Sequence, residues 1–267
     1  MLQTWRLRPA TCATLGLVAC VIAWASARAE RHGLAYRPAR PDEVVLAALR
    51  RDPAAGERAR LREALRAQPH DQALALRLAQ AELNSARKSG DVRPLGRAEA
   101  LLAPFAEAPS AELLVLRATV AQARHDFTAA LTDLQRALSM APDNAQARLT
   151  QAALFTVQGR YTEARASCAQ LSAIAPDYVP LLCHANLDGY TGARGRAMQL
   201  LEAAAVQLPE RGAQAWAGSL LCEHAFWAGE LERAERACAR ALALDPTDRY
   251  TRALHLDVLL EAGTPER

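Results

Sequence analysis

The stretch from residue 111 to residue 144 constrains the fold more than any other, because it contains two amphipathic segments separated by a short break. The segments read AELLVLRATVAQAR and FTAALTDLQRALSM, with His125-Asp126 between them. In each segment small alanines and large leucines recur at helical spacing. Pro142 follows the second segment, and proline is not tolerated inside a helix. The stretch therefore predicts two short helices joined by a tight turn.

Composition favours the same structure along the rest of the chain. Hydrophobic residues make up 51% of the 267 residues but aromatic residues only 5%, so alanine and leucine supply most of the apolar content. Both are strong helix formers. Small side chains also allow helices to pack closely. We therefore expect an all-α protein.

The stretch 111–144 resembles a tetratricopeptide repeat (TPR), a 34-residue helix–turn–helix unit with small residues at positions 8, 20 and 27 and proline at position 32. Those positions are occupied by Ala118, Ala130, Ala137 and Pro142. The next unit follows in register, with Ala152, Gly159, Tyr161, Ala164 and Pro176 at positions 8, 15, 17, 20 and 32. The resemblance implies an α-solenoid of antiparallel helix pairs, stacked into a right-handed superhelix.

The resemblance also divides the rest of the chain into units. We expect a degenerate helical pair at 42–70, a TPR with a lengthened internal turn at 71–110, TPRs at 111–144 and 145–178, an irregular TPR at 179–211, a TPR at 212–248 and a terminal capping helix at 249–262. The lengthened turn is either a tolerated loop or a carrier of specificity. In the irregular unit, Gly189 and Gly192 are expected to interrupt the first helix.

Residues 1–29 have the features of a signal peptide or membrane anchor. Arg6 and Arg8 precede an apolar run, and Ala27-Arg28-Ala29 resembles a cleavage site. The run is shorter than the ~20 residues that usually span a membrane. Cleavage, an uncleaved anchor and lipidation at Cys20 are the three alternatives. A proline-containing linker at 30–41 follows, and we expect an exported chain, periplasmic or anchored facing the periplasm.

Cleavage would remove three arginines and no acidic residue, which leaves 29 basic residues (32 minus 3) against 29 acidic residues. A neutral surface of this kind lacks the basic stripe that binds phosphates. We therefore expect a protein or peptide partner, no nucleic acid, and membrane contact only through residues 1–29.

The TPR resemblance implies that partners bind in a concave groove lined by the first helix of each pair. The residues of this chain at the groove positions include Gln122, Gln146, Leu149, Tyr190, Trp216, Glu223, Phe226 and Trp227. Aromatic side chains often anchor a partner. The alternative for Trp227 is that it packs into its own helix pair, and for Trp216 that it is a surface aromatic near a helix start.

Four cysteines lie outside the leader, at 168, 183, 222 and 238. Cys168 and Cys183 are equidistant from one predicted turn, and Cys222 and Cys238 from another, so each pair can bridge adjacent antiparallel helices. An exported chain meets an oxidising environment that favours such bridges. The alternative is four reduced cysteines packed in the core.

We find no catalytic, phosphate-binding or dinucleotide motif in the sequence and predict that the chain is not an enzyme and has no cofactor. Cys183-His184 and Cys222-x-His224 suggest a metal, but no C-x-x-C is present, and we predict no metal site. The leading hypothesis is a protein-binding scaffold. The alternative is a self-associating structural module, a homo-oligomer that pairs through the apolar helix carrying Leu256 and Leu260.

Overall fold

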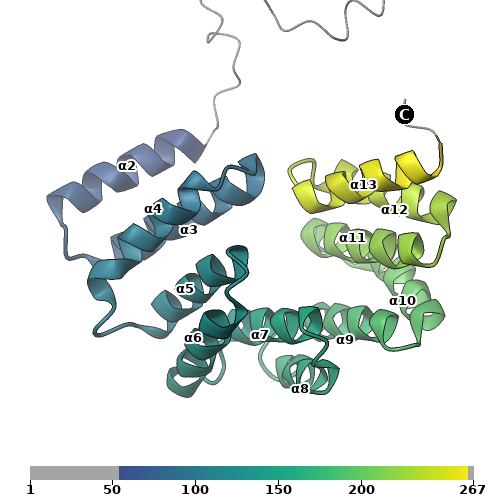
Figure 1. Ribbon diagram of the computed structural model, residues 1–267, viewed down its shortest axis with the longest axis horizontal. Helices are drawn as coiled ribbons and strands as arrows, with labels where there is room; N and C mark the ends of the chain where they lie inside the picture. Colours follow the sequence, from purple (N-terminus) through teal and green to yellow (C-terminus); the bar gives the residue numbers. More distant parts are fainter. Residues whose placement is uncertain (1–53, 264–267) are drawn as a thin grey trace, which may run out of the picture. The chain divides into compact units, whose positions relative to one another are not determined.

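The computed structural model describes residues 54–263, and every regular element in this range is a helix (Figure 1). The predicted leader at 1–29, the linker at 30–41 and the first half of the degenerate pair lie outside the described residues. The second half of that pair is helix α2 (Ala54–Ala67).

Five helix pairs follow α2 in the described range, each with a first helix and a second helix that lie side by side. The pairs are α3 (Gln72–Ser89) with α4 (Arg93–Leu102), which continues into the 3₁₀ turn η2 (Ala103–Phe105); α5 (Ala111–Ala123) with α6 (Phe127–Met140); α7 (Ala145–Val157) with α8 (Tyr161–Leu171); α9 (Tyr178–Tyr190) with α10 (Arg194–Gln207); and α11 (Arg211–Trp227) with α12 (Leu231–Leu244). The final described helix is α13 (Arg249–Glu261). The architecture is an α-solenoid, as predicted.

Three of the first helices, α3, α5 and α7, begin at side chains that cap them. Asp71, Ser110 and Asn144 each accept a hydrogen bond from the backbone N–H three residues on, at 3.0, 3.2 and 2.9 Å. Each cap of this kind stabilises a helix by about 1 kcal/mol. Gly159 and Gly229, at position 15 of their units, adopt left-handed backbone with φ of 72° and 75° and so start the turn to the second helix.

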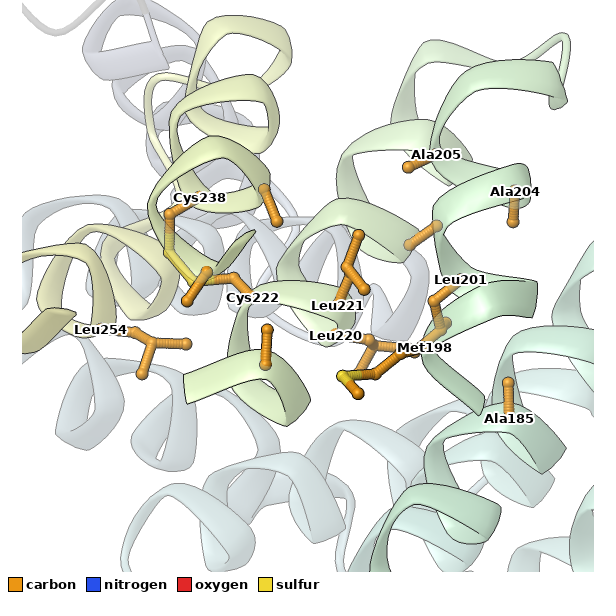
Figure 2. Packing of buried hydrophobic residues seen from close by; sticks show 14 of the residues in the cluster. Ala185, Met198, Leu201, Ala204, Ala205, Leu220, Leu221, Cys222, Cys238 and Leu254 are labelled. Atoms are coloured by element: carbon orange, nitrogen blue, oxygen red, sulfur yellow. A yellow bond between two sulfur atoms is a disulfide. The ribbon is translucent and has the colours of Figure 1, made fainter. Parts of the chain in front are cut away.

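The small residues of the repeat pattern form the contact between helices. Ala118 and Ala130 are fully buried and allow α5 and α6 to approach closely. The largest cluster joins α9 to α13, and Figure 2 shows Met198 and Leu201 of α10 beside Leu220 and Leu221 of α11.

The expectation of a lengthened turn in the unit 71–110 was wrong. The connection between α3 and α4 is residues 90–92, the same length as 124–126 and 158–160. The extra residues instead extend α3 to 18 residues, against 13 in α5 and α7. The helix continues because Leu83 and Ala86 stay on its buried face, and it ends where Gly90 adopts a φ of 70°.

The expected interruption of the helix at 179–211 by Gly189 was also wrong. Gly189 is buried inside the continuous helix α9, whereas Gly192, with φ of 101°, lies in the turn after it. A Cβ atom at Gly189 would overlap the ring of His224 from α11. The glycine therefore serves the close approach of two helices instead of ending one.

Within residues 54–263, no helix is both long and apolar enough to cross a membrane.

Candidate functional site

Five first helices line one shared cavity of about 310 Å³, which we call the first-helix cavity. Its walls include Arg87 from α3, Gln122 from α5, several residues of α7, Asn186 from α9 and Trp216 from α11. Successive first helices are neighbours along the array, so residues far apart in sequence meet in this cavity. It is the place where half of the predicted groove residues converge.

Four of the eight predicted groove residues line the cavity: Gln122, Gln146, Leu149 and Trp216. The side-chain amide of Gln146 donates to Thr150 Oγ1 at 3.1 Å, which orients it on the surface of α7. Gln122 and Trp216 are half-buried. The structure brings these four together from three helices.

Tyr190 and Glu223 form a separate polar cluster with Tyr250. The Tyr190 hydroxyl donates a hydrogen bond to the Glu223 carboxylate, and the Tyr250 hydroxyl also bonds to it. The pKa of Tyr190 is raised mainly by burial and, to a smaller extent, by the hydrogen bond to Glu223. The pKa of Tyr250 is raised by burial and by the charge of Glu223. These carboxylate and hydroxyl groups are already paired with one another.

Phe226 and Trp227 do not line the first-helix cavity. Phe226 packs against the core cluster of α9 to α13. Trp227 is 62% exposed, with its ring edge on Phe226 at 5.6 Å between centroids, and its backbone carbonyl accepts a hydrogen bond from Arg194 at 3.0 Å. Trp227 therefore does not pack into its own helix pair.

Two lining residues were absent from the predicted set, Arg87 and Asn186. Arg87 was missed because the groove positions were assigned only from residue 111 onward and not in the unit 71–110. Asn186 was missed because the groove register pointed to Leu187, which is buried in the core beside Cys168 and Cys183. A polar residue between two apolar neighbours, Asn186 was the signal in the sequence for the face of α9 that lines the cavity.

Asn186 is held in place by a buried histidine. Its Oδ1 lies 3.0 Å from Nε2 of His224, which is fully buried, and the His224 ring also packs edge-on against Tyr190 at 4.9 Å. Burial lowers the pKa of His224, so the ring is neutral near pH 7. With Oδ1 engaged, the amide N–H₂ of Asn186 has no partner among the described residues and is free to donate into the cavity.

Both cysteine pairs lie at disulfide-bonding distance. Cys168 of α8 and Cys183 of α9 have Cα atoms 5.7 Å apart, and Cys222 of α11 and Cys238 of α12 have Cα atoms 5.2 Å apart. Figure 2 shows the second pair within the core. Cys183 also lines the first-helix cavity, so the first pair connects the cavity wall to the second-helix layer.

A larger cavity of about 750 Å³ lies between α4, α5 and α6, away from every predicted groove residue. Four charged side chains along it are paired with each other: Arg117 with Asp133, and Arg124 with Glu99 at 2.6 Å. A fifth, Asp126, caps α6 by accepting a hydrogen bond from the backbone N–H of Ala129 at 3.1 Å. Within the described residues, no group of three His, Cys, Asp or Glu side chains could hold a metal ion. The absence of a metal, a cofactor and catalysis stays a prediction.

A family model described as tetratricopeptide repeat matches residues 115–179. Three similar solved structures each have a TM-score of 0.55. The APC/C hetero-tetramer Cut9–Hcn1 is 14% identical over 79% of this chain and 40% of that chain. A thermophilic TPR protein from Thermus thermophilus is 18% identical over 71% of this chain and 99% of that chain, and a monomeric mutant of IFIT1 with Gppp-AAAA is 14% identical over 79% of this chain and 53% of that chain. No curated protein matches the chain.

The chain spans 40% of the length of the Cut9–Hcn1 chain that it matches. At these identities the likeness shows the fold alone, and it agrees with the helix pairs and with the buried small residues. Residues 115–179 therefore belong to the tetratricopeptide-repeat family, and the described helix pairs have the fold of TPR proteins.

Proposed function

We propose that this protein is a non-enzymatic scaffold that binds a protein or peptide partner in the first-helix cavity. A TPR array suggests an interaction scaffold, because stacked helix pairs present an extended surface without chemistry of their own. The observation that carries the proposal is that one cavity collects side chains from five successive first helices.

The lining suits an extended peptide. Gln122, Gln146 and Asn186 supply amide groups that can pair with backbone N–H and C=O groups of a bound segment. Leu149 and Trp216 supply apolar area for a side chain, and tryptophan is a frequent anchor at interfaces.

We place this scaffold in the bacterial cell envelope, facing the periplasm. Residues 1–29 have the features of an export signal or anchor. Two cysteine pairs at bonding distance fit an oxidising compartment. Intact mass with and without reductant, on protein recovered from fractionated cells, tests this. A chain that begins at Glu30, or a full-length chain in the membrane fraction, supports it if two disulfides are lost on reduction, and a chain with free thiols in the cytosolic fraction contradicts it.

Site-specific photo-crosslinking in native cells tests the binding surface. A crosslinker replaces Ala153, which is exposed in the cavity wall, or Gln170, which is exposed on α8 outside it. We expect a discrete protein adduct from position 153 that is lost with Trp216→Ala, and none from position 170. Equal adducts from both positions, or no effect of Trp216→Ala, would contradict the proposal.

Self-association through α13 is a second candidate function. The residues at position 8 of three earlier units, Ala118, Ala152 and Cys222, are buried. The residue at the same position of α13 is Leu256, whose side chain is 56% exposed. Leu260 on the same helix is 64% exposed. Two adjacent exposed leucines on a helix favour contact with another apolar surface.

The charges of α13 favour a second copy of this chain as the occupant. Arg249 and Arg252 lie in its first half and Asp257 and Glu261 in its second half, opposite to what the helix dipole prefers. An antiparallel second α13 would set each basic half against an acidic half, and a two-fold interface does this twice. In light scattering we expect a dimer that Leu256→Glu converts to a monomer and Trp216→Ala leaves intact. A wild-type monomer rejects this candidate.

A further inference from the structure

The two ends of the array of helix pairs meet. The guanidinium of Arg249, the first residue of α13, lies so close to Gly90 that a Cβ atom added to this glycine would come within 2.7 Å of Arg249 Cζ. Figure 1 shows the end of α3 facing the start of α13. We call this contact the seam. It borders a cavity of about 390 Å³ lined by Asn84, Arg87 and Lys88 on one side and by Asp245, Thr247, Asp248, Arg249 and Tyr250 on the other.

The seam is not a consequence of the repeat itself. Units of a solenoid contact only their neighbours, so the fold does not require its ends to meet. The core residues of α3 pack with α4 and α5, and those of α13 pack with α9 to α12. Among the described residues, no hydrophobic core cluster crosses the seam. The side chains at the seam must therefore supply the attraction between the two ends.

The charges of the seam are complementary. The end of α3 presents Arg87 and Lys88, and the turn before α13 presents Asp245 and Asp248. Hydrogen bonds from Thr247 lower the pKa of Asp245, and the positive charge of Lys88 lowers it further. None of the ion pairs within residues 54–263 crosses the seam. The attraction therefore acts across the cavity and depends on salt concentration.

Arg249 adds a second charge interaction between the ends. A cation is unfavourable at the N-terminus of a helix and favourable at the C-terminus, because of the helix dipole. Arg249 begins α13, where its charge opposes the dipole of its own helix, but it lies against Gly90, the residue that caps the C-terminus of α3. Its position is therefore suited to α3 and not to α13.

The seam also borders the first-helix cavity. Arg87 lines both, and the wall of the first-helix cavity includes Trp216 of α11 as well. This cavity has walls from both ends of the array only while the ends are close together. We propose that the seam is an ionic clasp that closes the array and thereby completes the first-helix cavity. The role in completing the cavity rests on the proposed function, whereas the closure itself does not.

The distance between the two ends tests the closure without any partner. Spin labels are attached to the full chain through a noncanonical amino acid at Ala73 of α3 and Ala239 of α12, which are exposed and line no cavity described here. Double electron–electron resonance then measures the distance, with unlabelled protein added to suppress signals between molecules. Raising the salt from 0.1 M to 1 M shortens the screening length from ~10 Å to ~3 Å. We expect a short distance at low salt and a longer one at high salt.

Charge reversal at the seam tests which residues hold it. Exposed charge pairs are weak, so we expect Lys88→Glu to lower the ratio of closed to open molecules by about fivefold at low salt. Asp245→Asn, which keeps the oxygen that Thr247 bonds, should act in the same direction. Combining Lys88→Glu with Asp245→Lys should restore closure. Arg77→Glu is the matched control, since Arg77 is exposed on the same helix away from the seam, and it should leave the distance unchanged.

Distances that respond neither to salt nor to Lys88→Glu would overturn the clasp. Photo-crosslinking from position 153 tests the second part: we expect Lys88→Glu to reduce the adduct and the Lys88→Glu/Asp245→Lys pair to recover it. If the distances respond as expected but the adduct does not, the clasp and the proposed function stand and its role in completing the cavity is overturned. If the wild type gives no adduct from position 153, the proposed function fails and the closure stands on the distances alone.

Discussion

The N-terminal and C-terminal halves of this array share one fold but are held together by different contacts. Between α2, α3 and α4 the central contact is ionic: Glu82, only 1% exposed, accepts hydrogen bonds from Arg62 at 3.0 Å and from Arg97 at 2.8 and 3.0 Å. Arg117 of α5 likewise holds Asp133 of α6 with two hydrogen bonds. From α8 to α12 the corresponding contacts are two cysteine pairs and the buried His224.

The difference shows which features the fold requires and which it leaves open. Both halves keep small buried residues at the helix contacts, such as Ala98 and Ala130 in one and Ala197 and Ala234 in the other. The polar or covalent links between helices are variable additions to this common packing. They should therefore respond differently to reductant, pH and substitution.

Reduction should have the largest effect, and it should be confined to the C-terminal half. Bridges that close loops of 15 and 16 residues are each worth about 3 kcal/mol of unfolding free energy. Trp216 and Trp227 both lie in α11, so their fluorescence reports urea unfolding of this half. We expect reductant to lower its midpoint, and Cys222→Ala with Cys238→Ala to reproduce part of the loss. Identical midpoints with and without reductant would mean that the cysteines are free.

Gly189→Ala should destabilise the same half by about 2 kcal/mol, the usual cost of overpacking a core. The added Cβ would overlap the His224 ring, and a helix crossing cannot open without losing its other contacts. The matched control is Gly195→Ala in α10, where a Cβ meets no atom within 4 Å and the helix should gain up to about 1 kcal/mol. Thermal unfolding that ranks the two variants equally would show that the close α9–α11 approach is absent.

Glu82→Gln should destabilise the N-terminal half by about 2 kcal/mol, because hydrogen bonds to charged groups contribute about that much. Burial alone raises the pKa of Glu82, but the hydrogen bonds and charges of Arg97 and Arg62 outweigh it and hold the pKa below its ordinary value of 4.5. The stabilisation is therefore complete above pH 4.5 and is lost as the pH falls through the lower folded-state pKa. Circular dichroism across this range measures it.

Glu63→Gln is the control for this prediction. Glu63 pairs with Arg66 on the surface of α2, where an ion pair contributes little. A change in stability as large as that of Glu82→Gln would show that burial is not the cause.

His224 should give the smallest effect, a pH dependence in the C-terminal half. Burial lowers its pKa from the ordinary 6.5, so between the folded and unfolded pKa values the unfolded chain binds the extra proton. Stability is full above pH 6.5 and falls as the pH drops below it, by up to about 1.4 kcal/mol for each unit of pKa difference. The slope of unfolding free energy against pH should be reduced in His224→Gln. His184, whose pKa burial also lowers, accounts for a remaining slope.

Much of the fold was predictable because its determinants are local. The units 111–144 and 145–178 contain their turn residues, His125 and Gly159, and their small contact residues in order, and the helices lie where this pattern placed them. The cysteine pairs could also be proposed from the sequence, since residues equidistant from a turn lie level on antiparallel helices. Of the candidate site, Gln122, Gln146, Leu149 and Trp216 were found from the repeat register alone.

The tertiary structure decided what depends on contacts between distant helices. The sequence could not show that Gly189 makes room for His224, that Asn186 instead of Leu187 faces the cavity, or that Arg87 and Trp216 line the same cavity. Local propensity sets where a helix forms, but its rotation, its length and its crossing with a neighbour follow from the packing of whole faces. The repeat was therefore readable in the sequence, whereas the chemistry of its cavity was decided only when five helices met.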